Sequence, residues 1–284
     1  MKVLKPNTFL SVINDYYNYY FTVNDLSPIT KGNYTSYYKG IESFLIKEEK
    51  FNVLIEEVER TLMYKMYIFI AGKTSKTNAA RTVDLCKRIS EWACEVGLLD
   101  FDKIAHVKVK RDKIKDVVYL EENELSELMK IELTEAKELL AKHYYIIQAL
   151  QGLSYGDLRT FKIIKDNSGE WIYNHRCKGA NEYWVPVHPM TKEILAKYNY
   201  RLPFITNREY NSLIRKITGG LDINKHLTSH TGRKTFATRM YNEGWSIESI
   251  ADMMGHSSTE TTRKYYIKKS RKRLEMEVKQ RQIA

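Results

Sequence analysis

Residues that could act on a phosphate gather in one stretch near the end of the chain, residues 229–266. His230 and Arg233 lie three positions apart, His256 follows a glycine, and two consecutive tyrosines close the stretch. The transition state of phosphodiester cleavage concentrates negative charge on the non-bridging oxygens, which fixed cationic and hydrogen-bonding groups stabilise. Arg233, His230 and His256 supply such groups, and a phenol can act as a nucleophile. The stretch therefore indicates phosphoryl-transfer chemistry.

This chemistry is expected to proceed without a metal ion. The sequence contains no paired carboxylates at HNH, HEXXH or EF-hand spacing, which disfavours a metal-dependent nuclease. Each singled-out side chain also has an ordinary structural explanation when it is taken alone. Their combined spacing is what favours a catalytic site.

Three short helices would have to position these side chains. Apolar residues at helical spacing predict a helix over Thr235–Tyr241, and Gly244 then favours a helix end. Ser246 predicts the start of a second helix, which Gly255 ends. For the third helix, Ser257 is the predicted N-cap, because Glu260 three positions later completes a capping box. Packing of these helices would bring His230, Arg233, His256 and one tyrosine into a single pocket.

The sequence of this stretch resembles that of the tyrosine recombinases of the phage-integrase family. The segment HTGRKTFAT resembles the family's H-x-x-R-H-T-F-A-T, and MMGHSSTETT resembles its L-G-H-x-x-x-x-T-T. The resemblance implies that Tyr265, nine residues after His256, is the nucleophile and forms a 3′-phosphotyrosyl bond. It also implies that Lys178, in the turn after the second strand of a sheet, is the general acid. Neither ATP nor a metal ion is required as a cofactor.

One position departs from the family pattern. The family usually carries its first catalytic arginine in T-G-L-R-x-S-E-L, where this chain reads Q-G-L-S-Y-G-D-L, with Ser154 in the arginine's place. A hydroxyl cannot replace the charge and the two-pronged donor of a guanidinium. We expect Arg176 to substitute, since it lies two residues before Lys178 on the same strand face. The G-L-S-Y-x-D-L and R-x-K motifs resemble those of integrases from conjugative transposons.

Composition agrees with a DNA-binding enzyme. The chain has 284 residues, enough for two domains, and its formal net charge of +11 with a pI near 9.3 indicates an anionic partner. There is no membrane-spanning run, so we expect nucleic acid and no membrane. Three scattered cysteines and the lack of a signal peptide predict a reducing, cytoplasmic location.

The remaining sequence predicts a mainly α protein with a small three-stranded antiparallel sheet. Residues 1–103 indicate a helical bundle, which resembles the SAM-like core-binding domain of the family. Its helices are expected near Thr8–Thr22, after Ser27-Pro28, from Val53 to Ile70 with Gly72 at the end, and after Thr74 or Ser75. Residues 104–118 are dense in Lys and Arg and predict a basic linker, either merely solvated or lying along a DNA backbone.

Residues 119–284 are expected to form the catalytic domain. A helix near Tyr119–Met129 and a second one ending at Gly152 precede the segments FKIIK, EWIYNHR and YWVPV, whose turn chemistry predicts an antiparallel α+β arrangement. The tail predicts a basic helix with a thin apolar stripe of Ile267, Leu274 and Val278. This helix could dock on a neighbouring protomer, or it could be solvated or touch DNA.

The favoured interpretation is a site-specific recombinase of a mobile element, for integration or excision. It would act as a homo-tetramer on double-stranded DNA recombination sites, with possible accessory DNA-bending or directionality factors. Two alternatives stay open at this point. One is a non-catalytic helix-turn-helix DNA-binding protein, and the other is a type IB topoisomerase, which shares the same chemistry.

Overall fold

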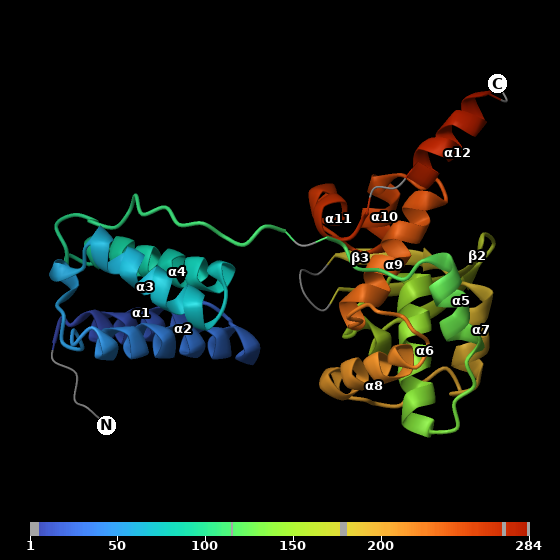
Figure 1. Cartoon of the computed structure of the whole chain (residues 1–284), viewed down its shortest axis with the longest axis horizontal. Coiled ribbons are helices and arrows are strands. Elements are labelled where there is room, and N and C mark those ends of the chain that lie inside the picture. Colours follow the sequence, from blue (N-terminus) through green and yellow to red (C-terminus); the bar gives the residue numbers. More distant parts are fainter. Residues whose placement is uncertain (1–5, 115, 177–180, 269–270, 283–284) are drawn as a thin grey trace. The chain divides into compact units, whose positions relative to one another are not determined.

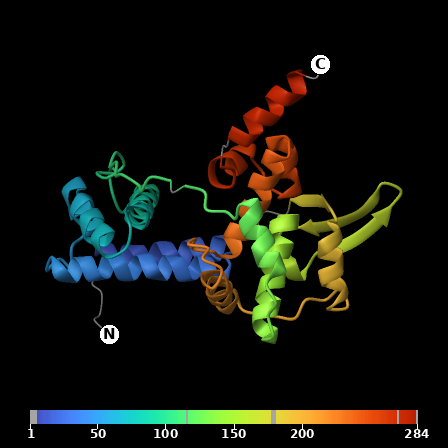
Figure 2. The ribbon, with the colours of Figure 1, turned by 45° about the vertical axis from the view of Figure 1, so that its right-hand side comes forward.

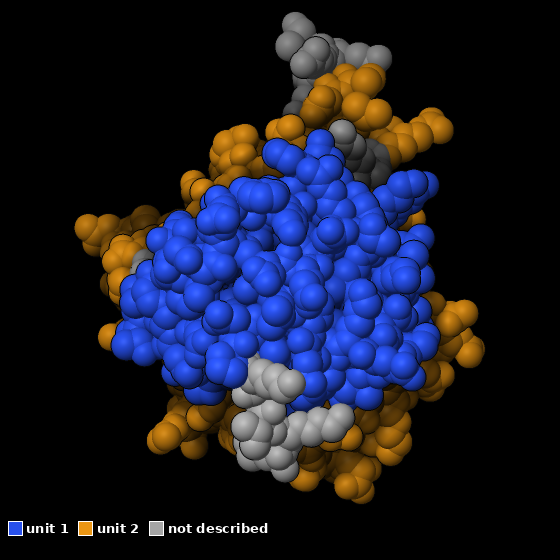
Figure 3. All heavy atoms as spheres, turned by 90° about the vertical axis from the view of Figure 1, so that its left-hand side faces the viewer, with its two compact units in different colours: residues 1–113 blue, residues 114–284 orange. Residues whose placement is uncertain are grey.

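A computed structural model of the chain describes residues 6–114, 116–176, 181–268 and 271–282. The chain divides into two compact units, residues 1–113 and 114–284 (Figures 1 and 3). No helix among the described residues is long and apolar enough to cross a membrane. Each unit has its own hydrophobic core.

The first unit is a helical bundle, as the sequence predicts. Its elements are α1 Phe9–Val23, α2 Pro28–Lys47, the 3-10 turn η1 Ile55–Glu57, α3 Arg60–Lys73 and α4 Lys76–Glu95. The hydroxyl groups of Thr8, Ser27 and Ser75 cap the starts of α1, α2 and α4 by accepting backbone N–H bonds. The Ser27 and Ser75 caps were expected from the sequence.

The expected helix over Val53–Ile70 is wrong at both ends. The backbone N–H of Phe9 donates to Val53 (2.8 Å) and that of Ile55 donates to Asn7 (2.9 Å), so this segment pairs with the residues around the start of α1. Helix α3 begins only at Arg60. It continues through Gly72 to Lys73, because the backbone at Gly72 stays helical and Thr74 forms the cap. A glycine favours a helix end chiefly by adopting a left-handed conformation, which Gly72 does not adopt.

Much of the expected linker packs on the first unit. Ile104 and Val107 are buried in its core, and the Tyr67 hydroxyl donates to the Lys110 carbonyl at 2.8 Å. The backbone N–H of Thr77 donates to the Asp112 carboxylate at 2.8 Å. The compact unit therefore extends to Lys113, beyond residue 103 where the helical bundle was expected to end.

The second unit combines helices with a three-stranded sheet, which confirms the predicted fold class. The strands are β1 Lys162–Asp166, β2 Gly169–His175 and β3 Glu182–Pro186, antiparallel in the order β1-β2-β3. The hairpin of β1 and β2 extends away from the helices (Figure 2). The helical elements are α5 Glu122–Lys130, α6 Ala136–Gln151, η2 Asp157–Arg159, α7 Pro189–Ala196, α8 Asn207–Gly219, α9 Ser229–Asn242, α10 Ile247–Met253, α11 Thr259–Tyr265 and α12 Arg271–Gln282.

Helix α6 is the centre of this unit, and its end fixes the neighbouring helix. It is buried over most of its length and packs against α8 and α9. Gly152 ends α6 with a φ of 66°, as the sequence predicts. A Cβ at Gly152 would lie 2.5 Å from Phe236 Cδ1 on α9, so the close approach of the two helices also requires glycine here.

Three expectations about the C-terminal helices need correction. Helix α9 begins at Ser229, six residues before the predicted start at Thr235. Helix α11 is capped by Ser258, whose hydroxyl accepts from the Glu260 N–H at 3.2 Å, and not by Ser257. Ile267 belongs to no tail stripe, because it is buried in the core of its own unit before α12 begins. Helix α12 also contacts α9, and its Met276 side chain lies against Gly244.

Candidate active site

Arg233 is the anchor of the site. It lies on α9, its side chain is 1% exposed, and it is the largest fully buried side chain among the described residues. Its two terminal nitrogens donate to the carbonyls of Gly152, after α6, and Met254, after α10. Three helices are thus joined through one guanidinium, which is held in a single orientation.

Arg233 remains a cation despite its burial. Burial, followed by the charge of Arg176, lowers the pKa of Arg233 to about 10, whereas Asp157 raises it. A pKa near 10 still leaves the group charged at neutral pH. Its buried Nε–H has no hydrogen-bond partner among the described residues. A buried, charged and incompletely paired donor is typical of a site that receives an anion.

His256 is held as a neutral imidazole beside Arg233. Its Nε2 accepts from the Arg233 guanidinium at 3.1 Å, because a guanidinium can only donate. The proton is therefore on Nδ1, which donates to the Thr262 hydroxyl on α11 at 2.7 Å. Burial, Arg233 and Arg176 together lower the pKa of His256 to about 3. The ring position is fixed from both sides.

Arg176 reaches the same place from the sheet. It comes directly after β2, and its Nη1 donates to the Met254 carbonyl at 3.1 Å, the carbonyl that also accepts from Arg233. Next to this carbonyl, Gly255 has a φ of 59°, and a Cβ there would lie 2.7 Å from Arg176 Cγ. Glycine is therefore needed at this turn, and the two guanidinium groups converge on one carbonyl.

The structure places Tyr266, rather than Tyr265, against this cluster. The Tyr266 ring centroid lies 4.7 Å from that of His256, and Arg233 Cζ lies 5.7 Å from the Tyr266 ring. His230, exposed on the first turn of α9, has its ring 6.4 Å from that of Tyr266. Tyr265 is 45% exposed, with Lys264 Nζ 5.4 Å from its ring centroid.

The other expected site residues divide into two cases. Lys178 lies outside the described residues. Ser154 is described, and it helps to form the turn that leads into η2. Its backbone N–H donates to the Asp157 carboxylate at 3.2 Å, and its hydroxyl accepts from the Asp157 N–H at 3.3 Å. Ser154 therefore orders the loop after α6 without supplying charge.

Asp157 is a site residue that sequence reasoning missed. Its side chain is fully buried, and its charge raises the pKa of both Arg233 and Tyr183. One carboxylate oxygen of Asp157 and the Tyr183 hydroxyl both lack a hydrogen-bond partner among the described residues. The sequence contains a signal for this residue, because Asp157 matches the acidic position of the family's T-G-L-R-x-S-E-L pattern. A buried carboxylate there offsets the charge of Arg233.

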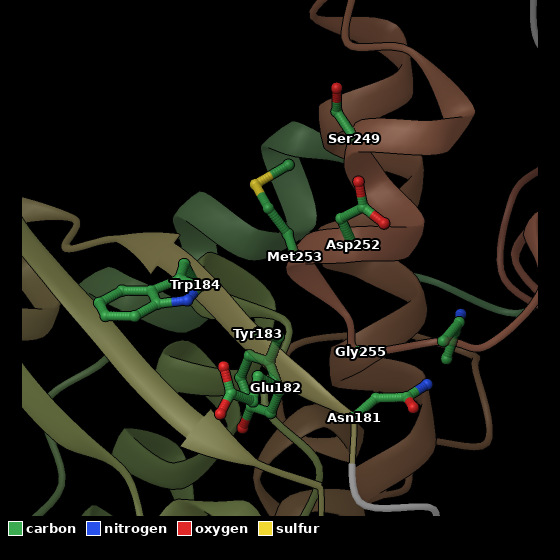
Figure 4. A pocket seen from close by; sticks show the side chains of 9 residues that line it. Asn181, Glu182, Tyr183, Trp184, Ser249, Asp252, Met253 and Gly255 are labelled. Atoms are coloured by element: carbon green, nitrogen blue, oxygen red, sulfur yellow. The ribbon is translucent and has the colours of Figure 1, made fainter.

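A hollow of about 540 Å³ opens beside His256, between β3 and α10. Figure 4 shows Met253 and Asp252 on α10 across the hollow from Trp184 and Glu182 on β3. The two acidic side chains at this hollow would repel a phosphate. The hollow therefore differs in character from the cationic cluster that it adjoins.

Fold and cluster together define a phosphoryl-transfer enzyme that provides fixed cations and a phenol. The model of the phage integrase family matches residues 96–273, so the chain belongs to that family. The family consists of tyrosine-type enzymes that break and rejoin DNA strands in site-specific recombination. This membership answers the helix-turn-helix and topoisomerase alternatives in favour of a recombinase.

Individual relatives extend the similarity over most of the chain. Tyrosine recombinase XerC of Pelobacter propionicus is 21% identical over 261 residues, which cover 86% of each chain. Tyrosine recombinase XerD of Oceanobacillus iheyensis is 22% identical and covers 89% of this chain and 92% of its own. Among solved structures, the Tn1549 transposon integrase with circular intermediate DNA has a TM-score of 0.73 at 14% identity, covering 96% of this chain and 99% of its own. A lambda integrase dimer on a core site also reaches 0.73, at 18% identity and 91% and 95% coverage.

Proposed function

We propose that the chain is the integrase of a mobile element, which cuts and rejoins duplex DNA through a 3′-phosphotyrosyl intermediate. The observation that carries this proposal is a connected cluster of two cations, an imidazole and a phenol. Arg233 and Arg176 share the Met254 carbonyl, His256 accepts from Arg233, and the Tyr266 ring packs on His256. Two cations and a phenol are what metal-free cleavage of a phosphodiester needs.

The cations would bind the scissile phosphate. Arg233 and Arg176 would donate hydrogen bonds to its non-bridging oxygens, so that a charged phosphate replaces the Met254 carbonyl as their acceptor. His230 would accept the tyrosine proton during cleavage and return it during rejoining. A tyrosine oxygen attacks phosphorus and the 5′ oxygen leaves. Lys178 is the proposed general acid that protonates the leaving 5′ oxygen. The phosphotyrosyl bond conserves the energy of the broken linkage, so rejoining needs no ATP.

Arg176 is the proposed replacement for the arginine that Ser154 displaces. Three observations support this role: its guanidinium shares a carbonyl with that of Arg233, and its charge lowers the pKa of both Arg233 and His256. Two neighbouring guanidinium groups repel one another when no anion lies between them. A bound phosphate would relieve that repulsion, which favours binding of the anion.

The assembly and the location are further proposals. Recombination between two duplex sites requires four strand cuts, so we infer a homo-tetramer on DNA, with accessory DNA-bending or directionality factors where the element needs them. The Tn1549 and lambda integrases were solved with DNA, and the lambda protein as a dimer. We also infer a cytoplasmic location, because the few scattered cysteines suit a reducing compartment.

The test begins with finding a substrate. Duplexes that the full chain retains from a random pool would be resynthesised with a nick next to each candidate cleavage position, so that the cut fragment diffuses away and the covalent complex accumulates. The reaction would contain EDTA. We expect a protein–DNA adduct that survives denaturation and carries the 5′-labelled side of the cut strand, as a 3′ linkage requires.

Two results would count against this function. If the chain bound specific duplexes but formed no adduct on any nicked version of them, a non-catalytic helix-turn-helix DNA-binding protein would be favoured instead. An adduct that carries the other side of the cut, through a 5′ linkage, would mean a different enzyme class. Sequencing DNA beside the gene for inverted repeats would supply natural candidate sites.

A further inference from the structure

We propose that Tyr266, the second tyrosine of the pair, is the nucleophile, although the nine-residue spacing from His256 favours Tyr265. This inference rests on the proposed function, because it assigns one step of that reaction. The two candidates are neighbours in the chain. The spacing of the family pattern favours Tyr265, whereas the geometry of the structure favours Tyr266.

The positions of the two rings favour Tyr266. Its ring lies against His256, near His230 and beside Arg233, with centroid distances of 4.7 Å to His256 and 6.4 Å to His230. A phenolate at Tyr266 would raise the pKa of Arg233, as expected for an anion beside this guanidinium. The ring of Tyr265, by contrast, lies beside the solvent-exposed Lys264. One phenol is thus within the cationic cluster, and the other faces solvent.

The backbone holds Tyr266 on both sides. Its N–H donates to the Thr262 carbonyl at 3.1 Å, and its carbonyl accepts from the Thr238 hydroxyl on α9 at 3.1 Å. Thr262 in turn binds His256. Thr262 therefore holds both the backbone of Tyr266 and the imidazole of His256, which links the position of the proposed nucleophile to that of the cluster.

Ile267, the next residue of the chain, restrains the tyrosine pair further. It is buried in the core of the second unit. Successive residues of a helix differ by about 100° in direction, so bringing Tyr265 to the place of Tyr266 means turning the end of α11 by one residue. That rotation would break the Thr238 bond and pull Ile267 out of the core. Tyr266 needs no such rearrangement.

The step balances without any added reagent. The Tyr266 oxygen forms a bond to phosphorus as the bond between phosphorus and the 5′ oxygen breaks, and the pair of electrons leaves with that oxygen. The phenol proton passes to a base, for which exposed His230 is suited, and a general acid protonates the leaving oxygen. Nothing is oxidised or reduced, and rejoining is the reverse.

The experiment compares two matched substitutions, Tyr266→Phe and Tyr265→Phe, in the full chain on a nicked duplex that traps the wild-type adduct. Each removes one hydroxyl and keeps the ring, so folding and DNA binding should stay within about twofold of wild type. We expect Tyr266→Phe to form no detectable adduct and Tyr265→Phe to form it at a rate within a few fold of wild type.

The other outcomes are equally definite. Adduct from Tyr266→Phe together with its loss from Tyr265→Phe would overturn the proposal and establish Tyr265. Adduct from both variants, or from neither, would also contradict it, because the proposal requires one indispensable and one dispensable hydroxyl. A wild-type chain that forms no adduct on any selected duplex would instead refute the proposed function, which keeps the two failures apart.

Discussion

The two compact units bury different kinds of side chain. Among its described residues, the first unit buries polar side chains that are all neutral: Thr8, Thr82 and Ser90. The second unit also buries four ionisable ones: Lys142, His143, Asp157 and Arg233. Burying a charge is costly unless it is paired and hydrogen-bonded. Asp157 and Arg233 belong to the candidate site, whereas Lys142 and His143 are bonded to the Ile131 carbonyl and the Tyr198 hydroxyl.

Aromatic side chains show the same contrast. In the first unit Tyr17 and Tyr34 pack edge to face at 5.2 Å between centroids, and the Tyr17 hydroxyl donates to the Tyr34 carbonyl at 2.9 Å. These are stabilising contacts of a core. In the second unit Tyr266 packs against an imidazole and a guanidinium. Residue type alone does not distinguish structural from catalytic tyrosines, whereas their neighbours do.

The largest effect should come from exchanging the charged anchor. Arg233→Lys keeps the charge but loses the fork that holds Gly152 and Met254, so cleavage should fall by roughly three orders of magnitude. The matched control is Arg88→Lys in the first unit, where Arg88 Nη1 donates to the Tyr34 hydroxyl at 3.4 Å. Adduct formation on the nicked duplex measures both. If both variants lost adduct formation to the same extent, the buried arginine of the second unit would have no special role in cleavage.

The second-largest effect concerns Arg176. Arg176→Ala should lose cleavage by roughly two orders of magnitude, the scale for removing one preorganised charge stabiliser. Adding Ser154→Arg should restore part of the rate by returning a guanidinium to the site. Single-turnover cleavage measures this. A near-normal rate for Arg176→Ala would direct attention to Arg159 or Lys162 instead.

A third prediction concerns pH. The pKa is lowered to about 3 for His256 and to about 4 for His143, in both cases chiefly by burial, whereas an unfolded histidine titrates near 6.5. The unfolded chain therefore binds more protons below about pH 6.5, so the free energy of unfolding of the second unit should fall as pH falls from there toward 4.

Tryptophan fluorescence can measure this effect in the second unit. Trp92 is the tryptophan of the first unit, so in a Trp92→Phe chain the remaining indoles report on the second. His256→Gln should make the melting temperature less dependent on pH between roughly 7 and 5, because it removes one of the three described histidines of this unit, His143, His188 and His256, whose pKa is lowered by burial. An unchanged pH dependence would show that His256 is not held neutral.

The smallest effect should come from the tail. Leu274 and Val278 on α12 are 63% and 50% exposed, a pair too small to anchor a helix but suitable for a groove on a neighbour. Deletion from Arg271 onward should spare single-site binding and weaken the two-site complex several fold in a gel-shift titration. Loss of single-site affinity with a shallower salt dependence would mean that the tail contacts phosphates.

Local signals in the sequence predicted much of the fold. Ser27 with Pro28, and Gly152 at the end of α6, each act through a few neighbouring bonds, so their positions follow directly from the sequence. The segment after Val53 could not, because its partners lie near the start of α1, far away in the chain. The start of α9 was missed for a related reason, since the glycine and polar residues of its first turns hide the helical pattern.

The site was predicted in composition more completely than in arrangement. His230, Arg233 and His256 follow from spacing. Arg176 follows from its place two residues before Lys178, although it lies just after the end of β2. The choice within the tyrosine pair does not follow, because it depends on the packing of the residues around Tyr266. Asp157 occupies the acidic position of the family pattern, but the sequence does not show that its carboxylate is buried and acts on Arg233.

A tyrosine of this cluster should become covalently joined to DNA, and peptide mapping is the direct way to see it. Trypsin cuts after Lys264 and Lys268, so both tyrosines lie in one four-residue peptide, Tyr265 to Lys268. Fragmentation of the nucleotide-linked peptide from the trapped wild-type adduct identifies the modified residue. We expect the nucleotide on Tyr266. A nucleotide on Tyr265 would contradict the assignment of the nucleophile, and one on any residue outside this peptide would contradict the site as a whole.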